Sequence, residues 1–177
     1  MFRSVENLRV QVYRGPSGQV QAYPSINDKY KNSYISVLEG VCIWIGIDDT
    51  DSTKGGCTTF VAFTIINRVM ERGYSLIGFP RLVRLNPNVP WKTRGNGAVA
   101  IHVGVGKGGK IQVGEKLDER LYSHQKNRSD EVDMDDLIDV VEETIEEQAF
   151  FSDEKTNPGF VVSKEKPSRE LYWKGVK

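Results

Sequence analysis

A nearly continuous apolar run covers residues 41–47, with the sequence Val-Cys-Ile-Trp-Ile-Gly-Ile. A run of this length is typical of a central β-strand that is buried on both faces. It ends abruptly at the acidic stretch Asp48–Ser52. A helical pattern follows, stops near Arg72 and Gly73, and has a predicted apolar stripe of Phe60, Phe63, Ile66, Val69 and Met70.

Three further segments have strand-like patterns. They are residues 74–85, 98–105 and 160–163. The segment 106–130 is rich in glycine and charged residues, so it predicts a long polar loop with, at most, a short strand over Ile111–Val113.

A second helix is predicted to begin at Asp133. Aspartate is a favoured N-cap residue, and a second acidic residue, Asp136, follows three positions later. One stripe of this helix consists of Leu137, Val141, Ile145 and Gln148, with Ile138 and Val140 alongside. The order strand, helix, strand, strand, helix, strand predicts an α+β fold. We expect a two-layer sandwich in which two helices cover one face of a mixed, mostly antiparallel sheet.

The two ends of the chain differ from its middle. Leu8–Tyr13 alternates weakly and predicts a strand, and after a glycine-rich turn Val20–Tyr23 predicts its returning partner. The expected organisation is an N-terminal extension or extra hairpin over residues 1–40, one domain over 41–165 and a loose tail over 166–177.

Composition excludes several classes of protein. The chain has 177 residues, 10% of them aromatic, and two cysteines. Such aromatic content is unlike that of a disordered chain, and two cysteines are too few for a disulfide framework or a four-cysteine zinc site. No apolar run approaches the ~18 residues of a membrane span, and the N-terminus lacks a signal-peptide core. We expect a cytoplasmic protein.

The net charge of zero conceals two segregated stretches of charge. Residues 80–110 contain six basic residues and no acidic one, whereas residues 130–147 contain ten acidic residues and no basic one. The acidic stretch is typical of a solvated helix face. The basic stretch is interleaved with Trp91 and several asparagines, which favours binding to a polyanion.

The strongest chemical signal is Gly-Ile-Asp-Asp-Thr-Asp-Ser over residues 46–52. Its carboxylates, Asp48, Asp49 and Asp51, stand close together at the end of a buried strand and repel one another unless a cation or hydrogen bonds compensate. Mg²⁺ is a suitable cation, because it binds one or two carboxylates together with substrate phosphates. The alternative interpretation is that Asp51 or Ser52 only caps a helix or a turn.

The residues after this motif are suited to binding phosphate, next to the carboxylates that are suited to Mg²⁺. Gly55 and Gly56 allow close approach to the backbone, and the predicted helix start offers N–H groups and a positive dipole end. Thr58 and Thr59 place hydroxyls there, and one of them could accept a phosphoryl group or bind metal. The combination predicts phosphoryl transfer.

Other candidate motifs are weaker. Residues 104–110 fit the pattern GxxxxGK, but Ile111 stands where a phosphate-binding loop needs Ser or Thr, so we interpret them as a flexible loop. Cys42 is expected in the core, and His102 and His124 are expected to be structural.

Three long motifs, in the same order, resemble those of the archaeal tRNA(Ile) 2-agmatinylcytidine synthetase (TiaS) family. The resemblance covers residues 41–163 of this chain. It is to the kinase-like N-terminal domain of that family. Its motifs are residues 46–52 with 55–59, residues 78–98, and residues 153–159.

The resemblance implies an ATP-dependent ligase that joins agmatine to carbon 2 of the wobble cytidine of an isoleucine tRNA, after phosphorylation of that cytidine. It implies that Thr58 becomes phosphorylated and that the three aspartates handle Mg²⁺ and the phosphates of ATP. It also implies that Lys92 and Arg94 face phosphate or substrate. Family members continue with a ferredoxin-like domain, an OB-fold and a zinc ribbon, so we expect a fragment or a stand-alone relative.

Two other functions remain open at this stage. Residues 49–53 fit the DxDxT pattern of haloacid-dehalogenase-like phosphatases, in which an aspartate is the nucleophile, but those enzymes need a parallel sheet. The other function is a non-catalytic RNA-binding module that uses the basic stretch.

Overall fold

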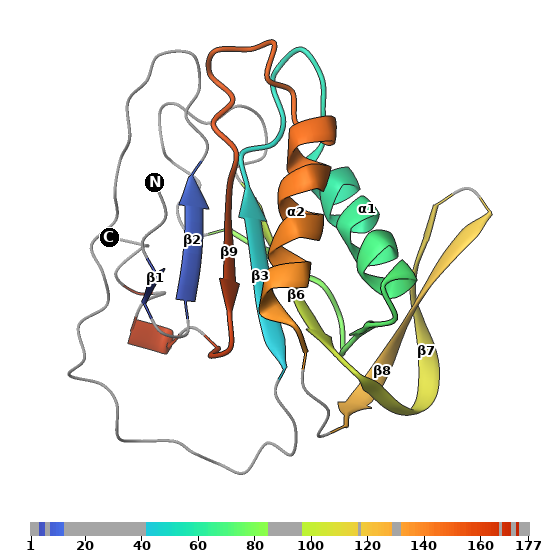
Figure 1. Cartoon of the computed structure of the whole chain (residues 1–177). Coiled ribbons are helices and arrows are strands. Elements are labelled where there is room, and N and C mark those ends of the chain that lie inside the picture. Colours follow the sequence, from blue (N-terminus) through green and yellow to red (C-terminus); the bar gives the residue numbers. More distant parts are fainter. Residues whose placement is uncertain are drawn as a thin grey trace.

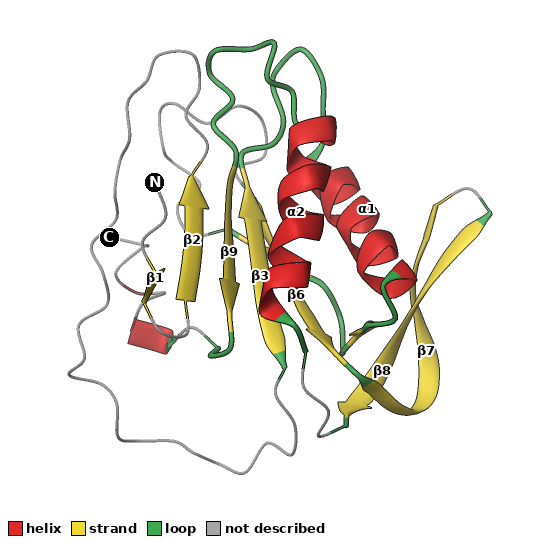
Figure 2. Ribbon diagram, viewed as in Figure 1, coloured by secondary structure: helices red, strands yellow, loops and turns green. Residues whose placement is uncertain are grey.

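A computed structural model describes residues 4–5, 8–12, 42–84, 97–116, 118–128, 132–166, 168–170 and 173. In chain order the elements are β1 (Ser4–Val5), β2 (Leu8–Val12), β3 (Ile43–Asp48), α1 (Thr58–Glu71), β4 (Ser75–Leu76), β5 (Arg81–Val83), β6 (Ala98–Gly104), β7 (Gly106–Lys116), β8 (Glu119–Asn127), α2 (Met134–Gln148) and β9 (Gly159–Ser163). The two helices lie on one face of the larger sheet (Figures 1 and 2). The predicted α+β sandwich is therefore confirmed.

Seven strands form the larger sheet, in the order β1-β2-β9-β3-β6-β4, with β5 also paired to β6. All the strand pairings within it are antiparallel. The central strand is β3, as the apolar run predicted. Because β3 and β9 are antiparallel with Asp48 opposite Gly159, the end of β3 meets the start of β9. This antiparallel sheet is not the parallel sheet that the phosphatase interpretation requires.

The core lies between the sheet and the two helices. Ile43, Ile45 and Ile47 alternate along β3 and are at most 2% exposed, and so face the helices. Leu137, Val141 and Ile145 of α2 are fully buried in the same core, which confirms the predicted stripe of this helix except for Gln148, which is half-buried. Within the described residues, neither helix is both long and apolar enough to cross a membrane.

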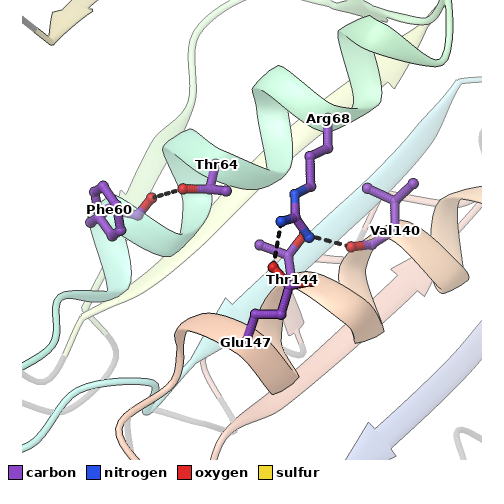
Figure 3. A network of polar contacts seen from close by, with 6 residues as sticks. All are labelled: Phe60, Thr64, Arg68, Val140, Thr144 and Glu147. Carbon is purple, nitrogen blue, oxygen red and sulfur yellow. Dashed lines mark hydrogen bonds and ion pairs between the residues drawn. The ribbon is translucent and has the colours of Figure 1, made fainter.

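The two helices also contact each other through polar groups (Figure 3). Arg68 of α1 donates to Thr144 Oγ1 at 3.2 Å and to Glu147 Oε2 at 2.5 Å. Thr144 Oγ1 in turn donates to the backbone oxygen of Val140 at 2.6 Å. The ion pair is half-exposed and contributes no more than about 1 kcal/mol, so apolar packing holds the helices together.

The prediction of a loop over residues 106–130 is wrong. β7 and β8 form a two-stranded antiparallel ribbon that extends beside α1 (Figure 1). The strand β7 has register shifts between Lys107 and Lys110 and between Gln112 and Gly114. Each shift breaks the alternation by which a strand is recognised, and the glycines there have low β-propensity, so the sequence resembles a loop.

Two further predictions need correction. The predicted stripe of α1 is right only in part: Ile66 and Val69 are buried as predicted, but Val61 and Ile65, which the prediction omitted, are also buried, whereas Phe60 is 37% exposed. Apolar residues surround most of this helix, so the pattern allowed either face. The single strand predicted over residues 74–85 is two short strands, β4 and β5.

At the N-terminus, β2 confirms the strand predicted over Leu8–Tyr13. It extends the sheet by pairing with β9 and with β1. The proposed partner strand Val20–Tyr23 lies outside the described residues.

Candidate phosphoryl-transfer site

The acidic stretch leaves β3 and enters a tight turn. Ser52 N–H donates to the Gly55 oxygen at 2.8 Å, and Gly55 N–H donates back to the Ser52 oxygen at 3.3 Å. The chain then enters α1 at Thr58, with Cys57 as the N-cap residue. The turn thus holds the aspartates beside a helix start, where backbone N–H groups have no partners within the helix and favour anions.

Asp49 has an unusual backbone conformation. Its φ of 52° is left-handed, and among the described residues no other non-glycine residue has a positive φ. Its Oδ2 accepts from Asn157 N–H at 2.9 Å, which connects the acidic stretch to the start of β9. Non-glycine residues in this conformation cost energy and cluster at functional sites.

The first two carboxyls of the motif hold protons more tightly than usual. Partial burial raises the pKa of Asp49 to about 6, and the charges of Asp48 and Asp51 add to this effect. Burial also raises the pKa of Asp48, whose Oδ1 accepts from Asp49 N–H at 2.8 Å. Raised values of this kind mark a place where a bound cation would be favourable.

Thr58 contacts the acidic stretch directly. It is the first residue of α1 and is 7% exposed. Its Oγ1 accepts from Thr50 Oγ1 at 3.1 Å and donates to Asp51 Oδ1 at 3.5 Å. The structure therefore brings a threonine hydroxyl, a carboxylate and a helix start together.

Thr59 faces a different group. It is exposed, and its Oγ1 lies 3.0 Å from the Sγ of Cys57. This contact lowers the pKa of the Cys57 thiol. Of the two threonines that the sequence offered as phosphate acceptors, Thr58 is therefore the one next to the aspartates.

The loop between α2 and β9 packs against the acidic stretch (Figure 1). Ser52 Oγ donates to Asp153 Oδ2 at 2.5 Å, and Thr156 Oγ1 donates to the backbone oxygen of Asp51 at 3.0 Å. Ser52 is fully buried, and Thr156 is 1% exposed. Buried hydrogen bonds of this kind fix the position of the loop that carries the aspartates.

Sequence reasoning placed Asp153, Thr156 and Asn157 in the third motif of the resemblance but gave them no role in the site. Their partners lie 101 to 108 positions earlier in the chain, and no local pattern shows such pairs. The available signal was the polar run over residues 153–159, directly before the last predicted strand.

The two glycines of the motif have steric reasons to be glycine. A Cβ on Gly55 would lie 2.9 Å from the Phe150 ring. Gly56 has a φ of +79°, and a Cβ there would lie 3.1 Å from the Asp51 Cα. Both therefore keep the turn closed against its neighbours.

The residues fit a metal–nucleotide complex better than a metal held by protein alone. Among the described residues, no three His, Cys, Asp or Glu side chains are grouped to hold a metal ion. Asp48 and Asp49, however, are adjacent carboxyls with raised pKa values. Mg²⁺ commonly uses one or two carboxylates and takes its remaining ligands from phosphate and water.

Two predicted cofactor-binding residues, Lys92 and Arg94, lie outside the described residues. His102 is far from the motif in the register and stacks on Trp44, with ring centroids 4.0 Å apart. Burial, with Arg81 and Lys166 nearby, lowers the pKa of His102 to about 4. A neutral, stacked histidine fits the structural role expected for it.

Solved structures and curated proteins are similar to this chain. A tRNA 2-agmatinylcytidine synthetase, TiaS from Archaeoglobus fulgidus, is 44% identical over 73% of this chain and 24% of its own length. Its counterpart from Thermoplasma volcanium is 39% identical over 76% of this chain and 30% of its own length. A solved complex of TiaS with an isoleucine tRNA and ATP matches with a TM-score of 0.53 and 44% identity, over 71% of this chain and 24% of that one.

A second solved structure, described as a tRNA fluorescent labelling enzyme, has a TM-score of 0.51 and 46% identity, over 69% of this chain and 23% of that one. The chain thus spans about a quarter of the length of these relatives. The model of the TiaS TCKD domain matches residues 44–177. Because this match covers most of the chain, the chain belongs to the TiaS TCKD domain family.

Proposed function

We propose that this chain is the ATP-handling part of a tRNA 2-agmatinylcytidine synthetase and that residues 48–58 form its phosphoryl-transfer site. One observation carries the proposal: the Thr58 hydroxyl lies at a helix start, between Thr50 and Asp51. The relatives are named for agmatinylcytidine synthesis on an isoleucine tRNA, and one is described in complex with ATP. The domain boundaries 41–165 belong to the same proposal.

The first chemical step is phosphorylation of Thr58. Its oxygen attacks the γ-phosphorus of ATP, the bond from that phosphorus to the β–γ bridging oxygen breaks, and ADP leaves. The hydroxyl proton passes to Asp51, whose Oδ1 is the carboxylate oxygen that contacts it. The start of α1 faces the phosphates, because a helix start favours negative charge, and Gly55 and Gly56 place no side chain in the turn before it.

Asp48 and Asp49 would hold Mg²⁺ together with the phosphate oxygens, while Asp51 stays with the Thr58 hydroxyl. The ion supplies charge stabilisation of the transferring phosphoryl group. The carboxyls with raised pKa values lose their protons more readily once a cation is near. Ser52 and Thr50 position the motif, the first through Asp153 and the second through Thr58.

The wider activity is also part of the proposal. The enzyme phosphorylates the wobble cytidine of an isoleucine tRNA, so that the agmatine amine can displace phosphate from carbon 2. This chain spans about a quarter of its relatives, so agmatine and tRNA chemistry are assigned to the complete enzyme. The ATP step is assigned to the chain itself.

Intact-mass measurement before and after incubation with Mg²⁺ and ATP, followed by peptide mapping, tests this proposal. We expect one added phosphoryl group on Thr58, absent in Thr58→Ala and absent without Mg²⁺. Thr59→Ala is the matched control, because Thr59 is the neighbouring hydroxyl that does not contact the aspartates; it should be modified like the wild type. Phosphate on Thr59, or an acyl phosphate on Asp49, would contradict the proposal.

A further inference from the structure

The β7–β8 ribbon carries a cluster of lysines that the proposed site does not use. Lys107 stands directly opposite Lys126, and Lys110 stands opposite His124. All three lysines are exposed. Like charges directly opposite each other destabilise a strand pair, so this arrangement costs folding stability unless an anion binds there.

The strands of the ribbon place no acidic residue beside this cluster. Residues 106–114 and 121–128 contain no Asp or Glu, and the ribbon's acidic residues, Glu115, Asp118 and Glu119, all lie near its tip. Two ion pairs between described residues, Arg68–Glu147 and Arg72–Asp136, join the two helices and involve none of these lysines. The half of the ribbon next to the sheet is therefore a strongly positive surface, which we call the basic ribbon.

Two glycines leave the backbone uncovered by side chains in the middle of the basic ribbon. Gly108 and Gly109 lie in the register shift between Lys107 and Lys110 and have no partner in the ladder. A Cβ on either would meet nothing within 4 Å, and Gly108 has a φ of +81°. A left-handed residue beside unpaired backbone is a common setting for anion binding by N–H groups, so a phosphate could approach the backbone between two lysines.

The face of the ribbon that carries the lysines also carries an aromatic side chain. Tyr122, His124 and Lys126 alternate along β8 and so share one face, with Gln112, Lys110 and Lys107 opposite them. Tyr122 is 37% exposed, and an exposed aromatic ring beside lysines is suited to contact with a ribose or a base.

The ribbon is anchored to the sheet at this end. Gly78 N–H donates to the His124 oxygen at 2.8 Å, and Arg128 N–H donates to the Val105 oxygen at 2.7 Å. Val105 N–H also donates to Asn127 Oδ1 at 2.7 Å. The lysines are therefore presented at a fixed position relative to the domain.

We propose that the basic ribbon, formed by Lys107, Lys110, Lys126 and the Gly108–Gly109 bulge, binds the phosphate backbone of RNA. The positive surface itself does not depend on the proposed function. The inference rests on that function only where it identifies the bound polyanion as RNA. It also gives a role to the GxxxxGK segment: its lysines and glycines contact phosphodiesters from a strand, not a nucleotide from a loop before a helix.

The experiment measures binding of a fluorescein-labelled isoleucine tRNA transcript to the full chain by anisotropy, from about 50 to about 200 mM KCl. We expect the triple variant Lys107→Gln, Lys110→Gln, Lys126→Gln to bind at least about tenfold more weakly at low salt. Its slope of log K against log salt should be smaller by about 2. The matched control neutralises three exposed cations outside the basic ribbon, Arg120→Gln, Lys164→Gln and Arg169→Gln, and should bind within about twofold of the wild type.

A second variant separates binding from folding. Lys126→Glu places opposite charges across the ladder from Lys107, so its melting temperature should stay equal or rise while RNA affinity falls. Unchanged affinity in this variant or in the triple variant would overturn the inference. Displacement of the tRNA by poly-glutamate at equal charge concentration would overturn the assignment to RNA.

The outcomes for the two proposals differ. A wild-type chain that binds tRNA through the lysines but takes up no phosphate from ATP contradicts the proposed function and supports this inference. A wild-type chain that is phosphorylated on Thr58, and whose triple variant binds tRNA normally, overturns this inference alone.

Discussion

Ser52 Oγ donates to Asp153 Oδ2 at 2.5 Å, although the two residues are 101 positions apart in the chain. The contact joins the turn after β3 to the loop before β9. The same carboxylate accepts from Lys155 N–H through its other oxygen, at 3.1 Å. The position of the aspartate motif therefore depends on a loop from the far end of the domain.

Ser52→Ala should destabilise the chain by about 1–2 kcal/mol, because it removes a buried hydrogen bond to a carboxylate. Thr53→Ala is the control, since Thr53 is an exposed hydroxyl in the same turn and should change stability by less than about 0.5 kcal/mol. Urea unfolding measures both. Equal stability of the two variants would show that the contact with Asp153 contributes nothing.

The same contact predicts a pH dependence. The hydrogen bond from Ser52 lowers the pKa of Asp153. A carboxyl whose pKa is lower in the folded state stabilises the fold above its ordinary pKa, and this stabilisation is lost as pH falls. The stability difference between the wild type and Ser52→Ala should therefore shrink in acid, below about pH 4. A difference that grows in acid would contradict this explanation.

Much of the fold could be predicted because its elements have strong local signals. The apolar run before Asp48 marked the central strand, and Asp133 caps α2 by accepting from the N–H groups of Asp135 and Asp136. The start of α1 at Thr58 also agrees with the prediction. The β7–β8 ribbon was missed because its glycines and register shifts remove the alternation on which strand prediction depends.

The candidate site could be predicted only in part, for a similar reason. The aspartates, glycines and Thr58 lie within eleven residues of one another, so one local motif contains them. Asp153 and Asn157 reach the motif only because β9 pairs antiparallel with β3 and brings their loop to the end of that strand. Long-range pairing of this kind has no period or spacing in the sequence.

Asp49→Asn should make the chain more stable at neutral pH. The carboxyl has its pKa raised from 3.8 to about 6, so the folded state loses stability as pH rises through that interval. The shift corresponds to about 3 kcal/mol, and solvent screening of a partly exposed group reduces this to about 1 kcal/mol. Asparagine tolerates the left-handed backbone of this position and cannot ionise.

Denaturant unfolding at about pH 4 and about pH 7.5 tests this, because the variant should match the wild type at the lower pH and exceed it at the higher one. Phosphate uptake from ATP should be lost in the same variant, since an amide is a poorer ligand for Mg²⁺. Lower stability than the wild type at the higher pH would refute the argument that the buried charge of Asp49 costs stability.

Gly56→Ala should cost more than Gly73→Ala, although both residues have a positive φ. Alanine in this conformation costs about 1–2 kcal/mol at either position. A Cβ on Gly73 meets nothing within 4 Å, whereas on Gly56 it also meets the Asp51 Cα at 3.1 Å and the Thr50 oxygen at 3.3 Å. We expect a total of about 2–3 kcal/mol for Gly56→Ala by thermal or urea unfolding. Equal costs would mean that the turn relaxes without strain.

Asp51→Asn should slow phosphorylation of Thr58 without preventing ATP from binding. Its Oδ1 contacts the Thr58 hydroxyl, and an amide in its place cannot take the proton of that hydroxyl. Loss of a general base commonly lowers rates by about 10²-fold or more. The measurement is the rate of phosphate uptake by intact mass at saturating Mg²⁺ and ATP, with the ATP-induced rise in melting temperature as the binding control.

A conservative variant separates a base from a mere support for Thr58. Asp51→Glu keeps a carboxylate that can take the proton and should recover part of the rate, whereas Asp51→Asn should not. An Asp51→Asn variant with a wild-type rate would remove Asp51 from the mechanism and leave the proton of Thr58 to another acceptor, with Asp49 the next carboxylate to test.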